Sequence, residues 1–167
     1  MNENSSNEFL IARIFDAPKE KVWKAWTDPE EAKRWWGPKD FTAPSVDIDF
    51  RIGGKYLFCM RGAVKPGEEA KDFWSTGQYL ELVPMEKIVL TDSFADEKGN
   101  IVSAAYYGMD ENWPREMQVI LTFEEAGPDK TKFTLHYPDI TGAQEKDLKD
   151  MREGWNQSLD KLAKILD

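Results

Sequence analysis

The chain has 167 residues, the length of one ordinary domain, so it can bury a core without disulfides or metal ions. Apolar residues make up 41% of the sequence and aromatic residues 13%, including seven Trp, which excludes a disordered chain. The net charge of −9 and the lack of a basic stripe exclude nucleic-acid binding and disfavour binding to anionic membranes.

The N-terminal part of the chain predicts a short tail and then a strand. No repeat, low-complexity tract or linker divides the sequence, so we expect a disordered tail at residues 1–7 and a single domain over residues 8–167. Residues 8–15 alternate and are rich in β-branched and aromatic side chains, which is typical of a strand.

Two short helices are predicted after this strand. Asp16 offers an N-cap and Pro18 suits the first turn, and residues 19–27 carry apolar side chains at helical spacing. Asp28, followed directly by a proline, starts a second short helix, and Gly37 ends it.

From residue 46 the hydrophobic period changes to two, which indicates a run of antiparallel strands. The glycine pair at 53–54 marks a hairpin turn between the first two of them. The segment 95–116 has little regular pattern but holds several aromatic residues, so we expect a functional lid there. The predicted strands are residues 46–50, 55–61, 73–83, 87–94, 118–124 and 132–137.

Residues 144–166 predict one long helix with a single apolar stripe, formed by Leu148, Met151, Trp155, Leu159, Leu162 and Leu166. The order of elements predicts an α+β domain in which a curved antiparallel sheet of about six to seven strands surrounds this C-terminal helix. Because a twisted sheet cannot lie flush along a straight helix, we expect a pocket between the two.

Aromatic residues are the main candidates for the wall of this pocket. Tyr56, Phe58 and Met60 share one face of their strand by the period of two. Tryptophan and tyrosine combine a large apolar body with a polar edge, which suits a planar or lipid-like ligand. The alternative is that these side chains only pack the core. The other candidate ligand-binding residues are Trp74, Gln78, Tyr106, Phe123, Phe133, Met151, Trp155 and Leu159.

No recognisable catalytic constellation is present, so the chain is more readily explained as a binding protein than as an enzyme. A single Cys and a single His, without an acidic cluster at ligand spacing, do not form a typical zinc site, and we expect no cofactor. His136 has the chemistry of a general base, but a partly exposed strand residue without a chemical role is the alternative. Arg61 is a candidate polar group at the pocket mouth.

The expected location is the cytoplasm. Cys59 has no second cysteine with which to form an internal disulfide, which suits a reducing compartment. Residues 1–8 lack the basic and apolar regions of a signal peptide, and no apolar run reaches the ~18 residues of a membrane span.

Several short motifs, in the same order along the chain, resemble those of the family homologous to the activator of the heat-shock protein 90 ATPase. The resemblance covers residues 8–166 and implies a helix-grip fold with a deep, mostly apolar cavity, as in START-like, polyketide-cyclase-like and pollen-allergen-like (SRPBCC) domains. The motifs are VWKAWTDPE at 22–30, RWWGP at 34–38, DFRIGGKY at 49–56, MRG at 60–62, YGM at 107–109, WPREM at 113–117 and EGWNQSL at 153–159.

Two functions follow as hypotheses. The first is binding of a small apolar or aromatic, lipid-like or polyketide-like ligand in a cavity of ~300–1,000 Å³. The second, implied by the resemblance, is a co-chaperone-like module acting on a larger ATPase, with a small pocket and an exposed apolar patch. Trp35 and Trp36, expected to be partly exposed, are candidates for that protein contact. We expect a monomer or a weak homodimer, with no nucleic-acid or membrane partner.

Overall fold

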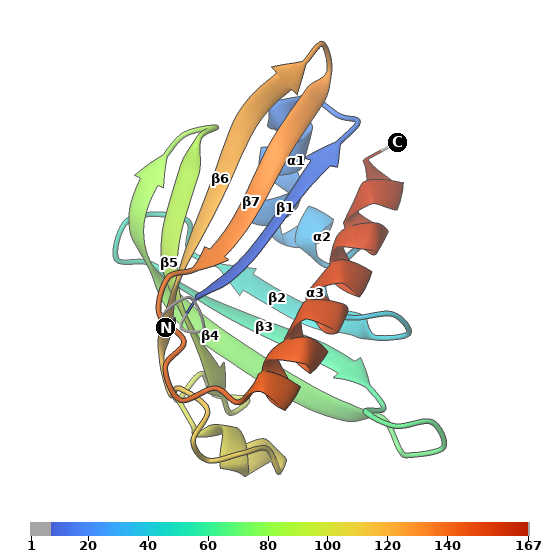
Figure 1. The fold of residues 1–167 in the computed structure, drawn as a ribbon, viewed down its shortest axis with the longest axis vertical. Coiled ribbons are helices and arrows are strands. Elements are labelled where there is room, and N and C mark those ends of the chain that lie inside the picture. Colours follow the sequence, from blue (N-terminus) through green and yellow to red (C-terminus); the bar gives the residue numbers. More distant parts are fainter. Residues whose placement is uncertain (1–7, 167) are drawn as a thin grey trace, which may run out of the picture.

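The structure is a computed structural model and describes residues 8–166 (Figure 1). The predicted tail, residues 1–7, lies outside the described residues. The elements are β1 (Phe9–Phe15), α1 (Lys19–Thr27), α2 (Pro29–Ala32), β2 (Thr42–Ile48), β3 (Lys55–Gly62), β4 (Lys71–Val83), β5 (Lys87–Ala95), a 3₁₀ turn (Ala104–Tyr107), β6 (Met117–Gly127), β7 (Lys130–Tyr137) and α3 (Glu145–Ile165).

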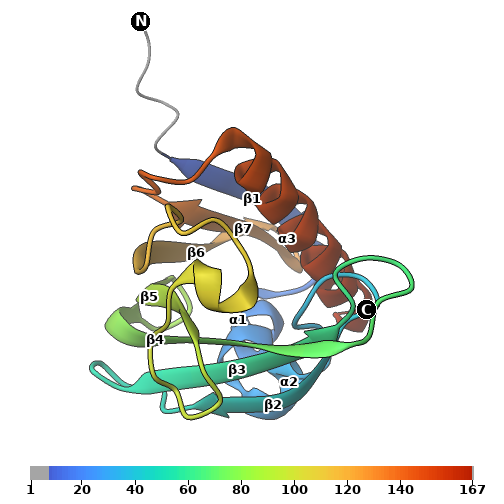
Figure 2. The same ribbon diagram turned by 90° about the horizontal axis from the view of Figure 1, so that it is seen from below.

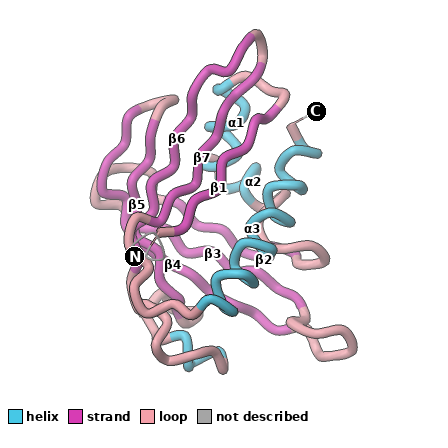
Figure 3. The backbone as a smooth tube through the Cα atoms, viewed as in Figure 1, coloured by secondary structure: helices cyan, strands magenta, loops and turns pink. Residues whose placement is uncertain are grey.

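The strands form one seven-stranded antiparallel sheet in the order β1-β7-β6-β5-β4-β3-β2. The sheet curls strongly, and α3 lies across its open side while α1 and α2 fill one end of the concave face (Figures 1 and 2). The predicted α+β fold, with a curved sheet around a long C-terminal helix and two short helices after the first strand, is confirmed. The tube view shows the loops that join these elements, the 95–116 segment among them (Figure 3).

The helix starts differ in part from the prediction. Pro18 occupies the N-cap of α1 with φ −68° and ψ 158°, so Asp16 is not the cap. A proline supplies the extended geometry of a cap without a side-chain hydrogen bond. Asp28 does cap α2, since its side chain accepts a hydrogen bond of 2.9 Å from the Glu30 amide. The helix ends at Ala32, and a turn carries the chain on toward Gly37.

Strand β2 begins and ends earlier than the strand predicted at residues 46–50. β2 ends at Ile48, because Phe50 leaves the ladder and packs edge-on against Trp23 and Tyr79, at ring centroid distances of 5.7 and 5.2 Å. The turn that follows reaches β3 through Gly53, whose φ of +84° strongly favours glycine.

The tryptophan pair after α2 is not a partly exposed pair. Trp35 is 0% exposed, and its indole nitrogen donates a hydrogen bond of 2.9 Å to the Ala25 carbonyl oxygen. Only Trp36 is half-buried. The expectation failed for Trp35 because the turn after α2 points this residue back under α1, where its N–H finds a backbone partner.

The 95–116 segment is anchored by Tyr107. The Tyr107 hydroxyl accepts a hydrogen bond of 3.1 Å from the Trp74 amide and donates one to the Ala95 carbonyl oxygen. Its ring packs against Phe73 and Phe94 at 5.2 and 5.7 Å. The segment is therefore tied to the ends of β4 and β5.

Over residues 8–166, no helix combines the length and the apolar composition needed to cross a membrane.

Candidate functional site

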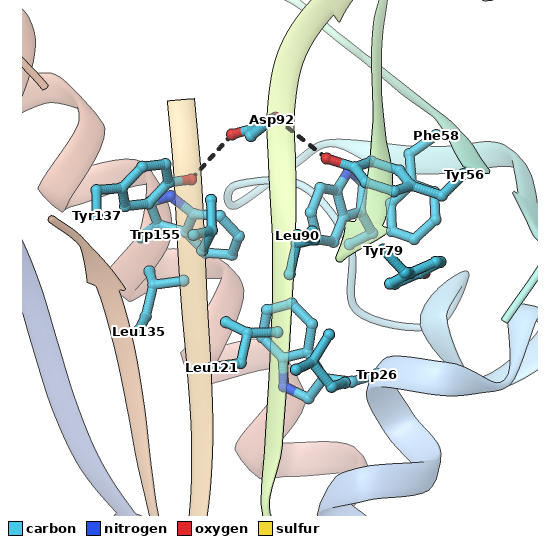
Figure 4. A pocket seen from close by; sticks show the side chains of 13 residues that line it. Trp26, Tyr56, Phe58, Tyr79, Leu90, Asp92, Leu121, Leu135, Tyr137 and Trp155 are labelled. Carbon is cyan, nitrogen blue, oxygen red and sulfur yellow. Dashed lines mark hydrogen bonds between the residues drawn. The ribbon is translucent and has the colours of Figure 1, made fainter. Parts of the chain in front are cut away.

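A small, partly open cavity lies inside the curl of the sheet, where α3 faces it (Figure 4). Its volume is about 40 Å³. Strands β3 to β7 supply most of the wall, and α1, the turn after α2 and α3 each add one tryptophan. The lining residues are Trp26, Trp36, Tyr56, Phe58, Tyr79, Ile88, Leu90, Asp92, Val119, Leu121, Leu135, Tyr137 and Trp155.

One carboxyl group interrupts this apolar wall. Asp92 follows Ile88 and Leu90 on the inward face of β5, because alternate strand residues share a face. The Tyr137 hydroxyl donates a hydrogen bond of 2.9 Å to Asp92 Oδ2. The Tyr56 hydroxyl lies 2.8 Å from the Thr91 carbonyl oxygen and 3.4 Å from Asp92 Oδ1. Figure 4 shows both phenols pointing at the carboxyl from opposite sides.

A glycine lets Tyr56 reach this position. Gly77 lies opposite Tyr56 on β4, and a Cβ atom there would stand 2.7 Å from the Tyr56 ring and 1.9 Å from the Thr91 carbonyl oxygen. Any side chain at this position therefore clashes with both. The ring crosses β4 over Gly77 and places its hydroxyl beside β5.

Burial dominates the electrostatics of the polar group. Asp92 as a whole is only half-buried, yet desolvation raises the pKa of its carboxyl, and the hydrogen bonds from Tyr137 and Tyr56 offset part of this rise. Desolvation, followed by the nearby Asp92 charge, raises the pKa of both Tyr56 and Tyr137 well above the ordinary value. Both phenols therefore remain protonated hydrogen-bond donors at neutral pH.

Stacked and edge-on aromatic rings form the opposite wall. Trp26 lies between Phe133 and Trp155, with centroid distances of 5.2 and 6.0 Å and interplanar angles of 21° and 28°. Trp36 meets Phe58 and Trp155 edge-on, at 4.6 and 5.5 Å. The Trp26 indole nitrogen is buried and has no hydrogen-bond partner.

α3 holds the loop that carries Trp36. Lys161 Nζ donates hydrogen bonds of 3.0 Å to the carbonyl oxygens of Gly37 and Phe41, and a longer one of 3.4 Å to that of Pro38. Gln157 Oε1 accepts a hydrogen bond of 3.1 Å from the Lys39 amide. The position of Trp36 therefore depends on contacts between this loop and the helix.

The structure brings Tyr56, Phe58 and Trp155 together in the cavity wall, and it places the other predicted pocket residues elsewhere. Met60 lies one step further along β3, with its side chain beside Gly37. The remaining inward residues belong to the packed core next to the cavity, either fully or partly buried: Phe123, Phe133, Met151 and Leu159.

Three predicted residues lie outside the cavity altogether. Trp74 and Tyr106 line a separate, open and polar depression together with Asp72. Gln78 is exposed, and its side-chain amide donates a hydrogen bond of 3.1 Å to the Gly53 carbonyl oxygen. Arg61, considered for the pocket mouth, is exposed and paired with Asp72 at 2.6 Å.

His136 also lies away from the cavity. Its Nε2 is 2.7 Å from Glu8 Oε1, on the strand pair β1–β7, and the imidazole is 28% exposed. Within residues 8–166, no group of three His, Cys, Asp or Glu side chains is arranged to hold a metal ion.

Sequence reasoning missed Asp92, Tyr137, Tyr79 and the tryptophans Trp26 and Trp36 as cavity residues. A signal for Asp92 was present, because it continues the inward alternation of Ile88 and Leu90. The Tyr137 partner could not be found this way, because its contact with Asp92 depends on the register of three strands.

Comparison with known proteins agrees with this architecture. A protein of Nitrosomonas europaea has a similar structure, with a TM-score of 0.74, 20% identity, and coverage of 98% of this chain and 96% of that chain. The AHSA1 protein of Silicibacter pomeroyi matches with a TM-score of 0.72, 22% identity, and coverage of 95% and 96%. A protein of Chromobacterium violaceum is 26% identical, with a TM-score of 0.72 and coverage of 96% and 97%.

The family assignment comes from the sequence. No curated protein matches the chain. The sequence model described as "Activator of Hsp90 ATPase homolog 1-like protein" matches residues 16–167. With this match and the curled sheet around α3, the chain belongs to the family of activator of Hsp90 ATPase homolog 1-like proteins, within the SRPBCC superfamily.

Proposed function

We propose that this protein binds a small, largely apolar or aromatic ligand in the cavity between the sheet and α3. The observation that supports the proposal is the Asp92 carboxyl in an otherwise apolar wall, with Tyr137 and Tyr56 aimed at it. A carboxyl at a core position lowers stability relative to an apolar side chain, and such departures from good packing concentrate at functional sites.

The cavity must open to admit such a ligand. A volume of about 40 Å³ accommodates only a few water molecules, far less than the ~300–1,000 Å³ of ordinary ligand sites. Trp36 and Trp155 are the half-buried members of the aromatic wall, whereas Phe58 is buried on β3, which is paired with a strand on each side. We propose that rotation of Trp36, with a shift of its loop, provides the space.

Indole resonances in ¹H–¹⁵N NMR spectra test this directly. A titration with flavonoids, fatty acids and polyketides should shift the indole signals of Trp36 and Trp155, which line the cavity, and not that of Trp74, which lies outside it. A bound ligand whose only contacts are near Trp74, or no binding across the whole panel, would overturn the proposal.

A variant that fills the cavity gives the second test. Leu90 lines the cavity, so Leu90→Trp should abolish binding. Leu80 on β4 is 44% exposed, and Leu80→Trp is the matched control that should bind as the wild type does. If Leu90→Trp keeps the fold by circular dichroism and also keeps its affinity, the ligand does not occupy this cavity.

The small cavity also favours a second candidate, a co-chaperone-like interaction. Ile101, Tyr106 and Met109 are exposed apolar side chains on a single connecting segment. Stimulation of an Hsp90 ATPase by the purified protein, lost on Tyr106→Ser and Met109→Ser, would support this function. An unchanged ATPase rate in the presence of the protein would exclude it.

A further inference from the structure

We propose that the ligand of this cavity is an organic cation, a compact amine or quaternary ammonium whose charged nitrogen pairs with Asp92 while its apolar part lies against the aromatic wall. This inference rests on the proposed function and names its ligand class. Three features of the cavity support it: an uncompensated carboxyl, a polar group whose hydroxyl protons are already used, and an array of electron-rich rings.

The Asp92 charge has no cationic partner in the described part of the chain. None of the thirteen lining residues is Lys, Arg or His, and Asp92 takes part in none of the ion pairs found among residues 8–166. A partly desolvated carboxylate without a counter-charge is destabilised, and a cation that enters the cavity relieves this cost. A bound cation also favours the ionised form of the acid.

The hydroxyl groups around Asp92 leave acceptors rather than donors for a ligand. A phenol has one proton to donate. Tyr137 directs its proton to Asp92 Oδ2 at 2.9 Å, and Tyr56 divides its single proton between the Thr91 carbonyl oxygen at 2.8 Å and Asp92 Oδ1 at 3.4 Å. A carboxylate accepts about four hydrogen bonds, so both Asp92 oxygens keep free lone pairs. This arrangement suits the N–H groups of an ammonium ion and offers little to a ligand carboxylate.

The rings around the carboxyl complete a cation site. Tyr56 stands 5.1 Å from Phe58 and 5.9 Å from Tyr79, measured between ring centroids. Trp36 continues this array, because it packs edge-on against Phe58 and Trp155 at 4.6 and 5.5 Å. Aromatic faces attract cations through the ring quadrupole, most strongly where water is excluded. The unpaired N–H of Trp26 is neutral and adds no positive charge. The net charge of −9 further favours the approach of cations over anions.

Matched probes separate charge from shape. The probes are phenethylamine, 2-phenylethanol and phenylacetate, which share a ring and differ in the charge of the polar end, together with tetramethylammonium as a small cation. Titration calorimetry should show phenethylamine binding at least tenfold more tightly than 2-phenylethanol, and phenylacetate not at all. The shifts of the Trp36 and Trp155 indole signals locate the bound probe.

A charge-removing variant tests the role of Asp92. Asp92→Asn should weaken phenethylamine binding tenfold or more and change 2-phenylethanol binding less than twofold. Asp47 is an exposed acid on β2, and Asp47→Asn, the control with the same loss of charge, should bind all probes as the wild type does.

The outcomes distinguish this inference from the function on which it rests. If the neutral and anionic probes bind as tightly as the amine, or if Asp92→Asn leaves amine binding unchanged, the ligand class is wrong while the cavity remains a binding site. Binding of neutral panel compounds without binding of either cation also overturns the ligand class alone. If no compound of either panel shifts the cavity indoles, both proposals fail.

Discussion

The hydroxyl of Tyr137 on β7 donates a hydrogen bond of 2.9 Å to Asp92 on β5, across the intervening strand β6. In a flat sheet, residues two strands apart lie roughly 9–10 Å apart, since each strand spacing is about 4.8 Å. The contact therefore requires the long tyrosine side chain and the inward curl of the sheet. It links the curvature of the fold to the polar group of the cavity.

Removing this donor should destabilise the protein. Tyr137→Phe leaves Asp92 Oδ2 without its shortest hydrogen bond, at an expected cost of about 1–3 kcal/mol in the free energy of unfolding. Urea denaturation at pH 7 measures this cost. Tyr106 is 60% exposed, so the control Tyr106→Phe should change the free energy by less than about 0.5 kcal/mol. A double-mutant cycle with Asp92→Ala, which removes the acceptor, should show that the two substitutions are not additive; additive effects would contradict the assigned contact.

The pH dependence of stability should reveal the raised pKa of Asp92. Below the unfolded-state pKa of ~3.9, the carboxyl is protonated in both the folded and the unfolded state, so it does not make the free energy of unfolding depend on pH. As the pH rises above that value, the unfolded chain loses its proton first, while the folded protein retains it. The free energy of unfolding of the wild type should therefore fall relative to that of Asp92→Asn, until the pH passes the raised folded-state pKa.

Denaturation curves of the wild type and Asp92→Asn between pH 3 and pH 8 test this sign. The tyrosines facing Asp92, Tyr56 and Tyr137, titrate far above this range, so they do not contribute to the trend. A stability difference that is flat with pH, or that grows in favour of the wild type, would contradict a raised pKa.

Two glycines should respond in opposite ways to alanine. A Cβ at Gly77 meets the Thr91 carbonyl oxygen at 1.9 Å, so Gly77→Ala forces β4 and β5 apart and displaces the Tyr56 ring. We expect a loss of about 2 kcal/mol or more. Gly154 lies within α3, and its added Cβ would meet only Pro38, at an ordinary 3.8 Å. Gly154→Ala should therefore stabilise the protein by about 0.5–1 kcal/mol.

Thermal denaturation followed by circular dichroism compares the two glycine variants under identical conditions. A Gly77→Ala protein as stable as the wild type would mean that β4 and β5 do not approach each other as closely as described. Loss of stability in Gly154→Ala would mean that the helix backbone around this residue departs from regular α geometry.

Local periodicity predicts much of the fold and part of the site. The period of two in residues 73–83 places Phe73 and Tyr79 on one face of β4 and Trp74 and Gln78 on the other. That parity alone separates Trp74 and Gln78 from the cavity wall, and β3 confirms it, because Trp74 pairs with Cys59 rather than with Phe58. The position of Trp74 and Gln78 outside the cavity could therefore have been predicted from the sequence.

Other parts of the site depend on contacts that a local pattern does not contain. The pairing of Asp92 with Tyr137 requires the registers β5–β6 and β6–β7 together. The cavity volume is set by how Trp36 and Trp155 meet edge-on, which follows from the path of a loop and a helix far apart in sequence. Periodicity predicted a gap between sheet and helix, but side-chain packing determines how much of it stays empty.

The loop that carries Trp36 should loosen when its link to α3 is removed. Lys161→Met deletes the hydrogen bonds to the carbonyl oxygens of Gly37, Pro38 and Phe41 and keeps the apolar stem of the side chain. We expect a loss of about 1–2 kcal/mol in the free energy of unfolding and a broadened Trp36 indole signal. Lys164 on the same helix is exposed, and Lys164→Met should change neither quantity.

The same variant tests whether Trp36 controls entry to the cavity. If rotation of Trp36 admits the ligand, a looser loop should raise the association rate in stopped-flow measurements of tryptophan fluorescence. The dissociation rate should rise as well, because the same side chain closes over the bound molecule. An unchanged association rate in Lys161→Met, with a broadened Trp36 signal, would show that the ligand enters the cavity by a route that does not depend on Trp36.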